Sequence, residues 1–537
     1  MSADRPHILV VGGGYVGMYT ALELQRKAKK ARITVVDPQP HMTYQPFLPE
    51  AAAGNLEPRH VVAPLRKTLR HAHIITGYVE SVDHARRTAN IVPVMGNPYE
   101  LTYDQIVLAP GSVSRTLPIP GLKENAVGFK TIGEAIYLRN QVLGELDAAD
   151  STDDPELRKA ATTFVFVGGG YAGIEALAEL EDMVRDAVKY YETLSQSDIR
   201  FVLVEASQRI LPEVGPEMGA YTVQRLLDRG IDIRLNTFLQ SCVDGVVKLS
   251  DGDEFTARTI VWTAGVKAHP MLGNTDLPLD ERGRVTCLPT LQVVDPEGNV
   301  VEGAWSAGDC AAVPDLSSDV EGATCSPSAQ HAVRQAKRLG ANIGIVLNGG
   351  QPVDYKHKHV GSVASLGLYK GVSQTYGIKT KGFLAWFMHR SYHLSRVPTF
   401  NRKVRVLADW TLALFLRREV VALGQLHDPR ASFELFATPT PAAKPSATPA
   451  PPTGGKVGDA EPAKPAAAKT EPAAAKAEPA ATPAESAPKT ESAAKTDPAA
   501  KAEPTAKGKA EPAAEGETAA AADSADKAAA ATARTAG

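Results

Sequence analysis

Two glycine-rich turns carry the residues of this chain whose spacing is best suited to chemistry. HILVVGGGYVG (7–17) and TFVFVGGGYAG (163–173) each run from a short apolar segment into three spaced glycines. The glycines are Gly12, Gly14 and Gly17 in the first copy and Gly168, Gly170 and Gly173 in the second. In a strand–turn–helix context, this G-x-G-x-x-G spacing allows a tight turn and lets the backbone approach a pyrophosphate at the helix N-terminus. One copy can be purely structural, but two copies in the same context predict two dinucleotide sites.

An acidic residue ends the strand predicted after each glycine turn. RITVVD ends in Asp37 and FVLVE ends in Glu205. A carboxylate at this place accepts hydrogen bonds from adenosine ribose hydroxyls, although Asp37 could instead cap the Asp-Pro turn that follows it. Glu205 would repel a 2′-phosphate and so favours NADH over NADPH, while Arg209 nearby weakens that inference. The second acid comes later than usual after its glycines, and residues 181–197 predict an extended helix or an insertion.

Composition and length limit the classes of protein to consider. The length of 537 residues predicts two to four domains. The formal net charge of −3 gives no sign of a nucleic-acid partner. The N-terminus lacks the pattern of a secretory signal, and no stretch of about 18 uncharged apolar residues predicts a membrane span. The four cysteines, Cys242, Cys287, Cys310 and Cys325, form no C-x-x-C pair. They predict small buried thiols in a reducing cytoplasm, with no disulfide framework and no metal site.

Four further stretches belong to the same pattern. HMTYQPFLPE (41–50), which contains Gln45, predicts a Pro-rich loop suited to cover a flat ring. QIVLAPG (105–111) and IVWTAG (260–265) predict apolar strands that end in small-residue turns, and GAWSAGD (303–309) predicts a later strand that ends in Gly-Asp.

Together these stretches resemble the flavin disulfide-reductase superfamily. The resemblance implies an α/β fold with two Rossmann-like domains, in which a discontinuous domain binds FAD and an inserted domain binds a nicotinamide dinucleotide. Asp309 would contact the ribityl–pyrophosphate region of the flavin. The other residues implied in cofactor binding, besides the six glycines, Asp37 and Glu205, are Tyr15, Gln45, Ala109, Gly111, Gly265 and Gln330.

Within the superfamily, residues 7–430 resemble a type II NADH dehydrogenase, a single-subunit and membrane-associated NADH:quinone oxidoreductase. YQPFLPE (44–50), GGGYAGIE with Glu175, SAQHAVRQ (328–335) and a basic aromatic C-terminal region carry the match. The cysteines are unpaired, whereas a disulfide reductase needs two neighbouring redox cysteines. The resemblance implies FAD and NADH as cofactors, menaquinone as acceptor and electron transfer without proton pumping.

Glu175, Gln330 and Arg334 are the catalytic residues that this resemblance implies. Glu175 would lie near the nicotinamide, which favours a functional role, and an ordinary helix acid near a positive helix N-terminus is the alternative. Arg334 occupies the position of the second glutamine of the family's quinone motif. It shares a helix face with Gln330, whereas Gln335 is rotated by about 100°. Arg334 would bond a quinone carbonyl, or it is an ordinary solvated charge.

Residues 377–418 mix aromatic and basic side chains. The aromatic residues are Phe383, Trp386, Phe387, Tyr392, Trp410 and Phe415, and the basic residues are Lys379, Lys381, Arg390, Arg396, Arg402, Lys403, Arg405, Arg417 and Arg418. Such a segment can lie in a membrane interface, and it predicts a peripheral protein at the cytoplasmic face of the cell membrane. A helix pair packed on the core or a dimer contact remains the alternative, so a homodimer stays open.

The predicted domains follow from these patterns. Residues 1–115 and 265–345 are expected to form the FAD-binding domain, 116–264 the NAD(H)-binding domain and 346–436 a helical membrane-associating region. Residues 437–537, rich in Ala, Pro, Lys and Glu, predict a disordered tail because they offer too little apolar surface to offset the entropy of ordering.

Two other functions remain open at this stage. One is a soluble FAD/NADH reductase of a ferredoxin-like carrier or of oxygen. The other is a redox-responsive flavoprotein that binds NAD(H) and turns over negligibly.

Overall fold

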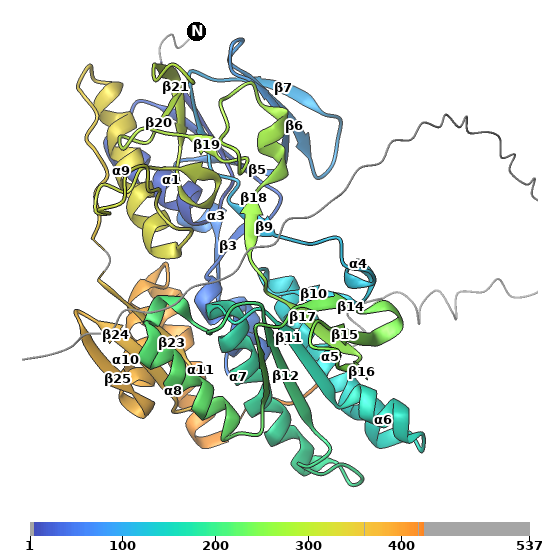
Figure 1. Ribbon diagram of the computed structural model, residues 1–537. Helices are drawn as coiled ribbons and strands as arrows, with labels where there is room; N and C mark the ends of the chain where they lie inside the picture. Colours follow the sequence, from blue (N-terminus) through green and yellow to red (C-terminus); the bar gives the residue numbers. More distant parts are fainter. Residues whose placement is uncertain (1–4, 359, 417, 424–537) are drawn as a thin grey trace, which may run out of the picture. The chain divides into compact units, whose positions relative to one another are not determined.

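The computed structural model describes residues 5–358, 360–416 and 418–423 (Figure 1). The predicted tail at 437–537, residues 424–436 of the predicted C-terminal region and Arg417 lie outside the described residues. Within the described residues, strands and helices alternate around two main sheets. The predicted α/β class is confirmed.

The first main sheet has the order β20-β21-β8-β1-β2-β5-β6-β7. Its strands are β1 (His7–Val11), β2 (Arg32–Asp37), β5 (His73–Asp83), β6 (Thr88–Pro93), β7 (Tyr99–Thr102), β8 (Gln105–Leu108), β20 (Gln292–Val294) and β21 (Val300–Ser306). Strands β21, β8, β1, β2 and β5 pair in parallel, and the other three add antiparallel edges. All five residues of β1 are buried, as expected for a central parallel strand.

Helices α1 (Tyr15–Lys27) and α9 (Ala329–Val346) lie side by side beside this sheet (Figure 1). The Oγ1 atom of Thr20 in α1 donates a hydrogen bond of 3.2 Å to the carbonyl of Ala336 in α9. A Cβ atom on Gly340 of α9 would lie 3.0 Å from the carbonyl oxygen of Thr20. The two helices therefore approach closely where α9 carries a glycine.

The second main sheet is inserted into the first part of the chain. Its five parallel strands are β10 (Ala126–Gly128), β17 (Thr259–Trp262), β11 (Thr163–Val167), β12 (Arg200–Glu205) and β13 (Asp232–Leu235), in that order. Helices α5 (Ile132–Ser151), α6 (Pro155–Ala161), α7 (Tyr171–Ala187) and α8 (Pro216–Leu227) belong to this part. The antiparallel strands β9 (Ser112–Ser114) and β18 (Val266–Ala268) carry the chain in and out. The predicted insertion is confirmed, while the exact domain boundaries stay a prediction.

Short elements complete both parts. They are β3 (His41–Thr43), β4 (Val62–Pro64), β14 (Leu239–Ser241), β15 (Val246–Leu249), β16 (Glu254–Thr256), β19 (Val285–Thr286), β22 (Ala311–Ala312), α2 (Leu48–Ala52), α3 (Leu65–Thr68) and α4 (Leu122–Asn125).

The prediction of a loop over residues 41–50 is wrong. Strand β3 pairs with β4, and a 3-10 turn (Gln45–Phe47) leads directly into α2. Tyr44, Phe47 and Leu48 are buried, so these side chains pack in the core and order the segment.

The long interval after the second glycine turn also has a structural explanation. Helix α7 runs to Ala187, and a 3-10 turn (Val188–Tyr190) and an irregular segment then precede β12. The interval is therefore a long helix followed by a loop.

The C-terminal part is only partly helical, which corrects the expectation for residues 346–436. Strands β23 (Gly361–Ser365), β24 (Gly371–Thr375) and β25 (Ile378–Lys381) form an antiparallel sheet ahead of α10 (Gly382–Arg396) and α11 (Phe400–Leu416). Short strands rich in Gly, Ser and Lys carry a weak alternation pattern, so the sequence did not reveal them. Among the described helices, none is both long and apolar enough to cross a membrane.

Candidate functional site

The first glycine turn brings strand, helix and a neighbouring turn into close contact. Gly12 has a φ of +96°, and a Cβ atom there would lie 2.3 Å from the carbonyl oxygen of Ala109. A Cβ atom on Gly17 would lie 1.7 Å from the carbonyl oxygen of Gly12. Neither position accepts a side chain, so the backbones of β1, α1 and the Ala109 turn meet at this point.

Gly14 differs from both of these glycines because a Cβ atom there would meet nothing within 4 Å. Gly14 is the N-cap of α1, no side chain caps this helix end, and its first turn holds no acidic residue. The first amides of α1 thus face open space with a positive helix dipole behind them. This arrangement fits a pyrophosphate group.

The second turn repeats this geometry in the inserted part. Gly168 has a φ of +114°, and a Cβ atom there would lie 2.7 Å from the Thr263 carbonyl, while one on Gly173 would lie 2.0 Å from the Gly168 oxygen. Gly170 is the N-cap residue of α7, and no side chain caps this helix end. A Cβ atom on Gly170 would meet nothing within 4 Å. The two turns therefore have equivalent geometry, each fits a pyrophosphate group, and we call them the two cradles.

The predicted acids occupy equivalent positions beside the two cradles. Asp37 accepts hydrogen bonds of 2.6 Å from the amides of Gly13 and Gln39. Glu205 accepts hydrogen bonds from the amides of Gly169, at 2.5 Å, and Ser207, at 2.7 Å. Each acid caps its turn and also lies against the glycine loop, so Asp37 does cap its turn, while its contact with a ribose stays a prediction. Each carboxylate oxygen retains a lone pair for a ribose hydroxyl.

Three polar residues meet where the chain passes from the first sheet to the second. The hydroxyl of Ser112 donates a hydrogen bond of 2.7 Å to Asp309 and accepts one from the ammonium group of Lys130. Burial lowers the pKa of Lys130. The side-chain amide of Gln45 donates to the Lys130 carbonyl at 3.2 Å. The predicted residues Gln45 and Asp309 are thus joined through Ser112 and Lys130, which carry no motif and were missed in the sequence.

Two more predicted residues stand at the turns that leave the two sheets. Gly111 and Gly265 have φ values of +73° and +96°, and a Cβ atom on either would meet nothing within 4 Å. Tyr15 is the first residue of α1 and its ring centre lies 6.2 Å from that of Tyr44. Their contacts with a cofactor stay predictions.

The predicted quinone motif opens helix α9, and its members point to different partners. The side-chain amide of Gln330 donates to the Gly361 carbonyl at 3.3 Å. Gln335 is buried and accepts a hydrogen bond of 2.8 Å from the amide of Gly308, next to Asp309. Arg334 donates to the Gln330 carbonyl at 2.9 Å. Of the two candidates for the second glutamine, Gln335 is therefore the one in contact with the Gly-Asp turn.

Arg334 instead lines a small basic cavity of about 350 Å³. The other residues that line it are Lys337, Arg338, Ala341, Tyr355, Lys356 and His357. These surroundings favour the interpretation of Arg334 as a solvated charge, and its quinone contact remains a proposal.

Glu175 is buried between α7, β23 and α10. One carboxylate oxygen accepts a hydrogen bond of 2.9 Å from the amide of Ser365 and lies 3.1 Å from Nε2 of His389. His389 is 2% exposed. Glu175 is therefore more than an acid near a helix N-terminus, because it binds two elements of the C-terminal part.

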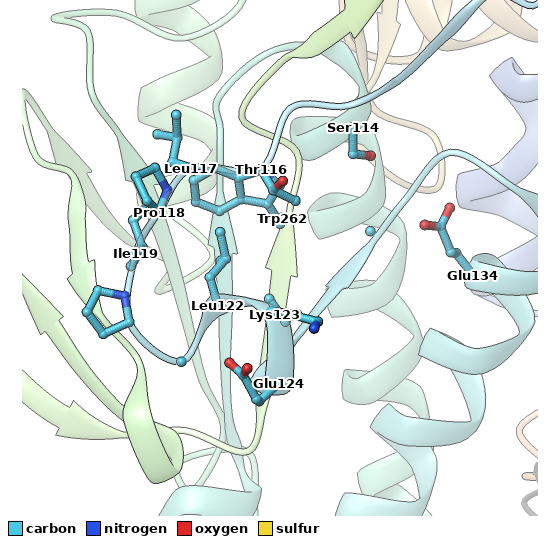
Figure 2. Close-up of a pocket in the computed structure, with 14 residues that line it drawn as sticks. Ser114, Thr116, Leu117, Pro118, Ile119, Leu122, Lys123, Glu124, Glu134 and Trp262 are labelled. Atoms are coloured by element: carbon cyan, nitrogen blue, oxygen red, sulfur yellow. The ribbon is translucent and has the colours of Figure 1, made fainter. Parts of the chain in front are cut away.

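A cavity of about 580 Å³ lies in the segment that joins the two sheets (Figure 2). The apolar side chains that line it include Leu117, Ile119, Leu122 and Trp262, and its charged side chains are Lys123, Glu124 and Glu134. None of the predicted site residues lines this cavity. We therefore assign it no part in the candidate site.

The four cysteines, all within the described part of the chain, are buried and free. Burial raises the pKa of Cys310 and Cys325 to about 11 each. They are thiols rather than reactive thiolates at neutral pH, as the sequence predicted.

A comparison with known families now identifies the architecture. The sequence profile of the pyridine nucleotide-disulphide oxidoreductases matches residues 6–336, more than half of the chain. The chain belongs to this family. The match begins just before the first cradle and ends within α9, so it includes both cradles and Asp309.

Individual members of the pyridine nucleotide-disulphide oxidoreductase family align over most of the chain. A type II NADH:quinone oxidoreductase of Mycobacterium tuberculosis is 26% identical over 438 residues, which cover 79% of this chain and 90% of that protein. A type II NADH:quinone oxidoreductase of Staphylococcus epidermidis is 29% identical over 402 residues, covering 73% and 94%. The structure of NDH2 from Plasmodium falciparum in complex with NADH has a TM-score of 0.71 at 17% identity, covering 78% and 100%, and so shares the fold.

The open space at Gly14 allows a direct test of the first cradle. Gly14→Ala meets no protein atom, so the fold is retained, but its methyl group occupies the approach of the pyrophosphate. We expect FAD to bind at least about tenfold more weakly, which corresponds to a loss of about 1.4 kcal/mol of binding free energy. The measurement is the fraction of FAD that the protein retains after dialysis. Gly144→Ala in α5 also meets nothing within 4 Å and is the matched control. Equal FAD retention in both variants would contradict the assignment.

Proposed function

We propose that this chain is a FAD-dependent oxidoreductase that transfers electrons from NADH, through bound FAD, to a membrane quinone. The observation that carries the proposal is the pair of equivalent cradles, joined by β9 and β18 in one chain. Relatives named type II NADH:quinone oxidoreductase align over nearly their whole length and support NADH and quinone as the substrates.

The first cradle suits FAD. Gly12, Gly14 and Gly17 would hold its pyrophosphate, and Asp37 would accept from its ribose. The remainder of the FAD molecule would contact Ala109, Gly111, Gln45 and Asp309. Ser112 and Lys130 would hold Asp309 in position. When bound, FAD supplies the two-electron chemistry that no side chain here provides.

The second cradle suits NADH. Gly168, Gly170 and Gly173 would hold its pyrophosphate, and Glu205 would accept from the adenosine 2′-hydroxyl and repel the 2′-phosphate of NADPH. Gly265 would let the chain turn beside the dinucleotide. The protein thus contributes binding, orientation and electrostatics to the reaction.

The quinone-binding side of the proposed site consists of residues at the start of α9 together with Glu175. We propose Gln330, Glu175 and, less directly, Arg334 as residues of that side, with Gln335 fixing the Gly308–Asp309 turn. Menaquinone as acceptor and transfer without proton pumping belong to the same proposal.

Acceptor specificity separates this proposal from the other two functions. We expect purified FAD-loaded protein to oxidise NADH rapidly with a soluble menaquinone analogue and slowly with oxygen or an iron–sulfur carrier. Activity confined to the iron–sulfur carrier would exclude the quinone assignment. Turnover near or below about one per minute with every acceptor, far under the usual enzyme range, would support a redox-responsive flavoprotein instead.

We also propose that α10 and α11 dock peripherally on the cytoplasmic face of a membrane. Their exposed apolar side chains include Phe383, Leu384, Phe387, Phe400, Val404, Leu407, Leu412, Leu414 and Phe415. Asp409 turns inward, where it accepts from the Glu57 amide and lies 2.6 Å from Nδ1 of His60. Asp409, the one acidic residue of α10 and α11, is thus removed from the outer surface, which favours an interface rich in anionic lipid.

The structure corrects the interpretation of two basic residues of this segment. The side chain of Arg418 is 4% exposed, and its Nε atom lies 3.1 Å from Asp186. Arg390 is buried, and its guanidinium donates to Glu50 at 2.8 Å and lies over the rings of Trp386 and Trp410. Arg390 therefore anchors α10 to the core and cannot reach lipid.

Vesicle binding tests the docking face. The double variant Phe387→Asp/Leu407→Asp replaces two half-exposed apolar side chains by charges, and we expect at least about tenfold weaker co-sedimentation with vesicles containing phosphatidylglycerol. Oxidation of NADH with a soluble quinone analogue should persist. Met95→Asp, at an 87% exposed position between β6 and β7, is the control. Unchanged binding of the double variant would refute the docking face.

A further inference from the structure

A row of buried and half-buried titratable side chains connects α7 with α10 and the segment before α2. His389 and His393 lie one helical turn apart on α10, and their ring centres are 4.5 Å apart. Nε2 of His389 lies 3.1 Å from Glu175, and Nδ1 of His393 lies 3.0 Å from the hydroxyl of Tyr44. The row thus runs from Glu175 to Tyr44, next to Gln45.

Acidic groups outnumber basic ones around this row. Glu179, one turn beyond Glu175 on α7, accepts from the side chains of Asn55 at 2.9 Å and Ser365 at 3.1 Å. Glu50 accepts from Arg390 and, at 2.7 Å, from the indole nitrogen of Trp410. Glu50, Glu175 and Glu179 are all buried.

Against these three carboxylates and the nearby Asp182 stand the guanidinium groups of Arg390 and Arg418 and the two imidazoles of α10. Burial, and next the charge of Glu50, raise the pKa of Glu179 to about 7. Burial, and next the charge of His389, hold the pKa of His393 well below its usual value, so His393 is neutral near pH 7. Burial raises the pKa of Tyr44 well above its usual value. Negative charge therefore lies close to the His389–Glu175 pair.

A purely structural role explains His389 poorly. Its Nδ1 atom is buried and has no hydrogen-bond partner among the described residues. An unsatisfied buried polar atom costs about 1–3 kcal/mol, which an apolar side chain of similar size avoids. Packing and hydrogen bonding among the described residues therefore leave the Nδ1 atom of His389 without a structural role.

We propose that the His389–Glu175 pair, continued by His393 and Tyr44, holds the proton that quinone reduction takes from the protein. This inference rests on the proposed function. In the overall reaction NADH, a quinone and one proton give NAD⁺ and a hydroquinone. The hydride of NADH accounts for two electrons and one proton, and the hydroquinone contains one proton more. His389 gives up that proton, which then bonds to a quinone oxygen, and water restores it to the pair.

Comparison of two acceptors tests this inference. His389→Gln keeps a hydrogen-bonding side chain but holds no titratable proton. We expect its turnover with a menaquinone analogue to fall by about 100-fold, within the usual range for proton transfer by a side chain, while ferricyanide reduction stays within about twofold. Ferricyanide accepts electrons without protons. His84→Gln is the matched control, because His84 is also buried and contacts a tyrosine hydroxyl at 3.1 Å, in the turn after β5.

A second variant covers the case in which His389→Gln does not fold. His389→Asn places a shorter amide at the same position, leaves Glu175 unchanged and should show the same split between the two acceptors. Equal loss with both acceptors, or no loss with either, would overturn the proposal.

A spectroscopic readout is independent of turnover. In protein labelled with ¹³C-histidine, the ring signal of His389, assigned with His389→Gln, should move toward that of a neutral imidazole in Glu175→Gln. A signal that does not respond to Glu175 would overturn the proposal. If the wild-type protein reduces ferricyanide but no quinone, the proposed function fails. If it reduces quinone and His389→Gln does so equally well, only the proton-holding pair fails.

Discussion

Both cradles depend on close contact between the backbones of a strand and a helix, and only glycine allows that contact. At Gly12, Gly17, Gly168 and Gly173 an added Cβ atom would overlap backbone atoms. Because the strand and the helix meet there, the helix N-terminus is presented without a cap and its amides remain available. The acids that follow, Asp37 and Glu205, hold each loop in place through its amides. Phosphate binding is thus a property of the backbone, repeated twice.

The segments that join the two cradles also carry residues of the proposed site. Strands β9 and β18 lead into and out of the inserted sheet, and Ser112 at the start of β9 links Asp309 with Lys130. The C-terminal part closes against the same region, where Glu175 binds Ser365 and His389. The buried pair Glu50–Arg390 attaches α10, and breaking such a pair from one side typically costs about 3–5 kcal/mol. The C-terminal helices are therefore part of the site as well as candidates for docking.

The features that the sequence predicted are those that depend on local backbone geometry. Glycine spacing, apolar parallel strands and a terminal acid require only neighbours in the chain, so both cradles, β2, β12 and the inserted sheet were predictable. The order of the segment at 41–50 comes from burial of Tyr44 and Phe47, which its Pro-rich composition does not predict. Lys130, Ser112 and His389 were missed because their partners lie far away in sequence. Likewise Arg390 looked like a lipid-facing cation until its contact with Glu50, 340 residues away, was visible.

One anaerobic absorption experiment tests most directly whether the two cradles hold two different dinucleotides that exchange electrons. The purified protein should show the bands of an oxidised flavin, lose them on addition of NADH and regain them on addition of a menaquinone analogue. A preparation that remains colourless after reconstitution with FAD, or flavin bands that NADH leaves unchanged, would contradict the account.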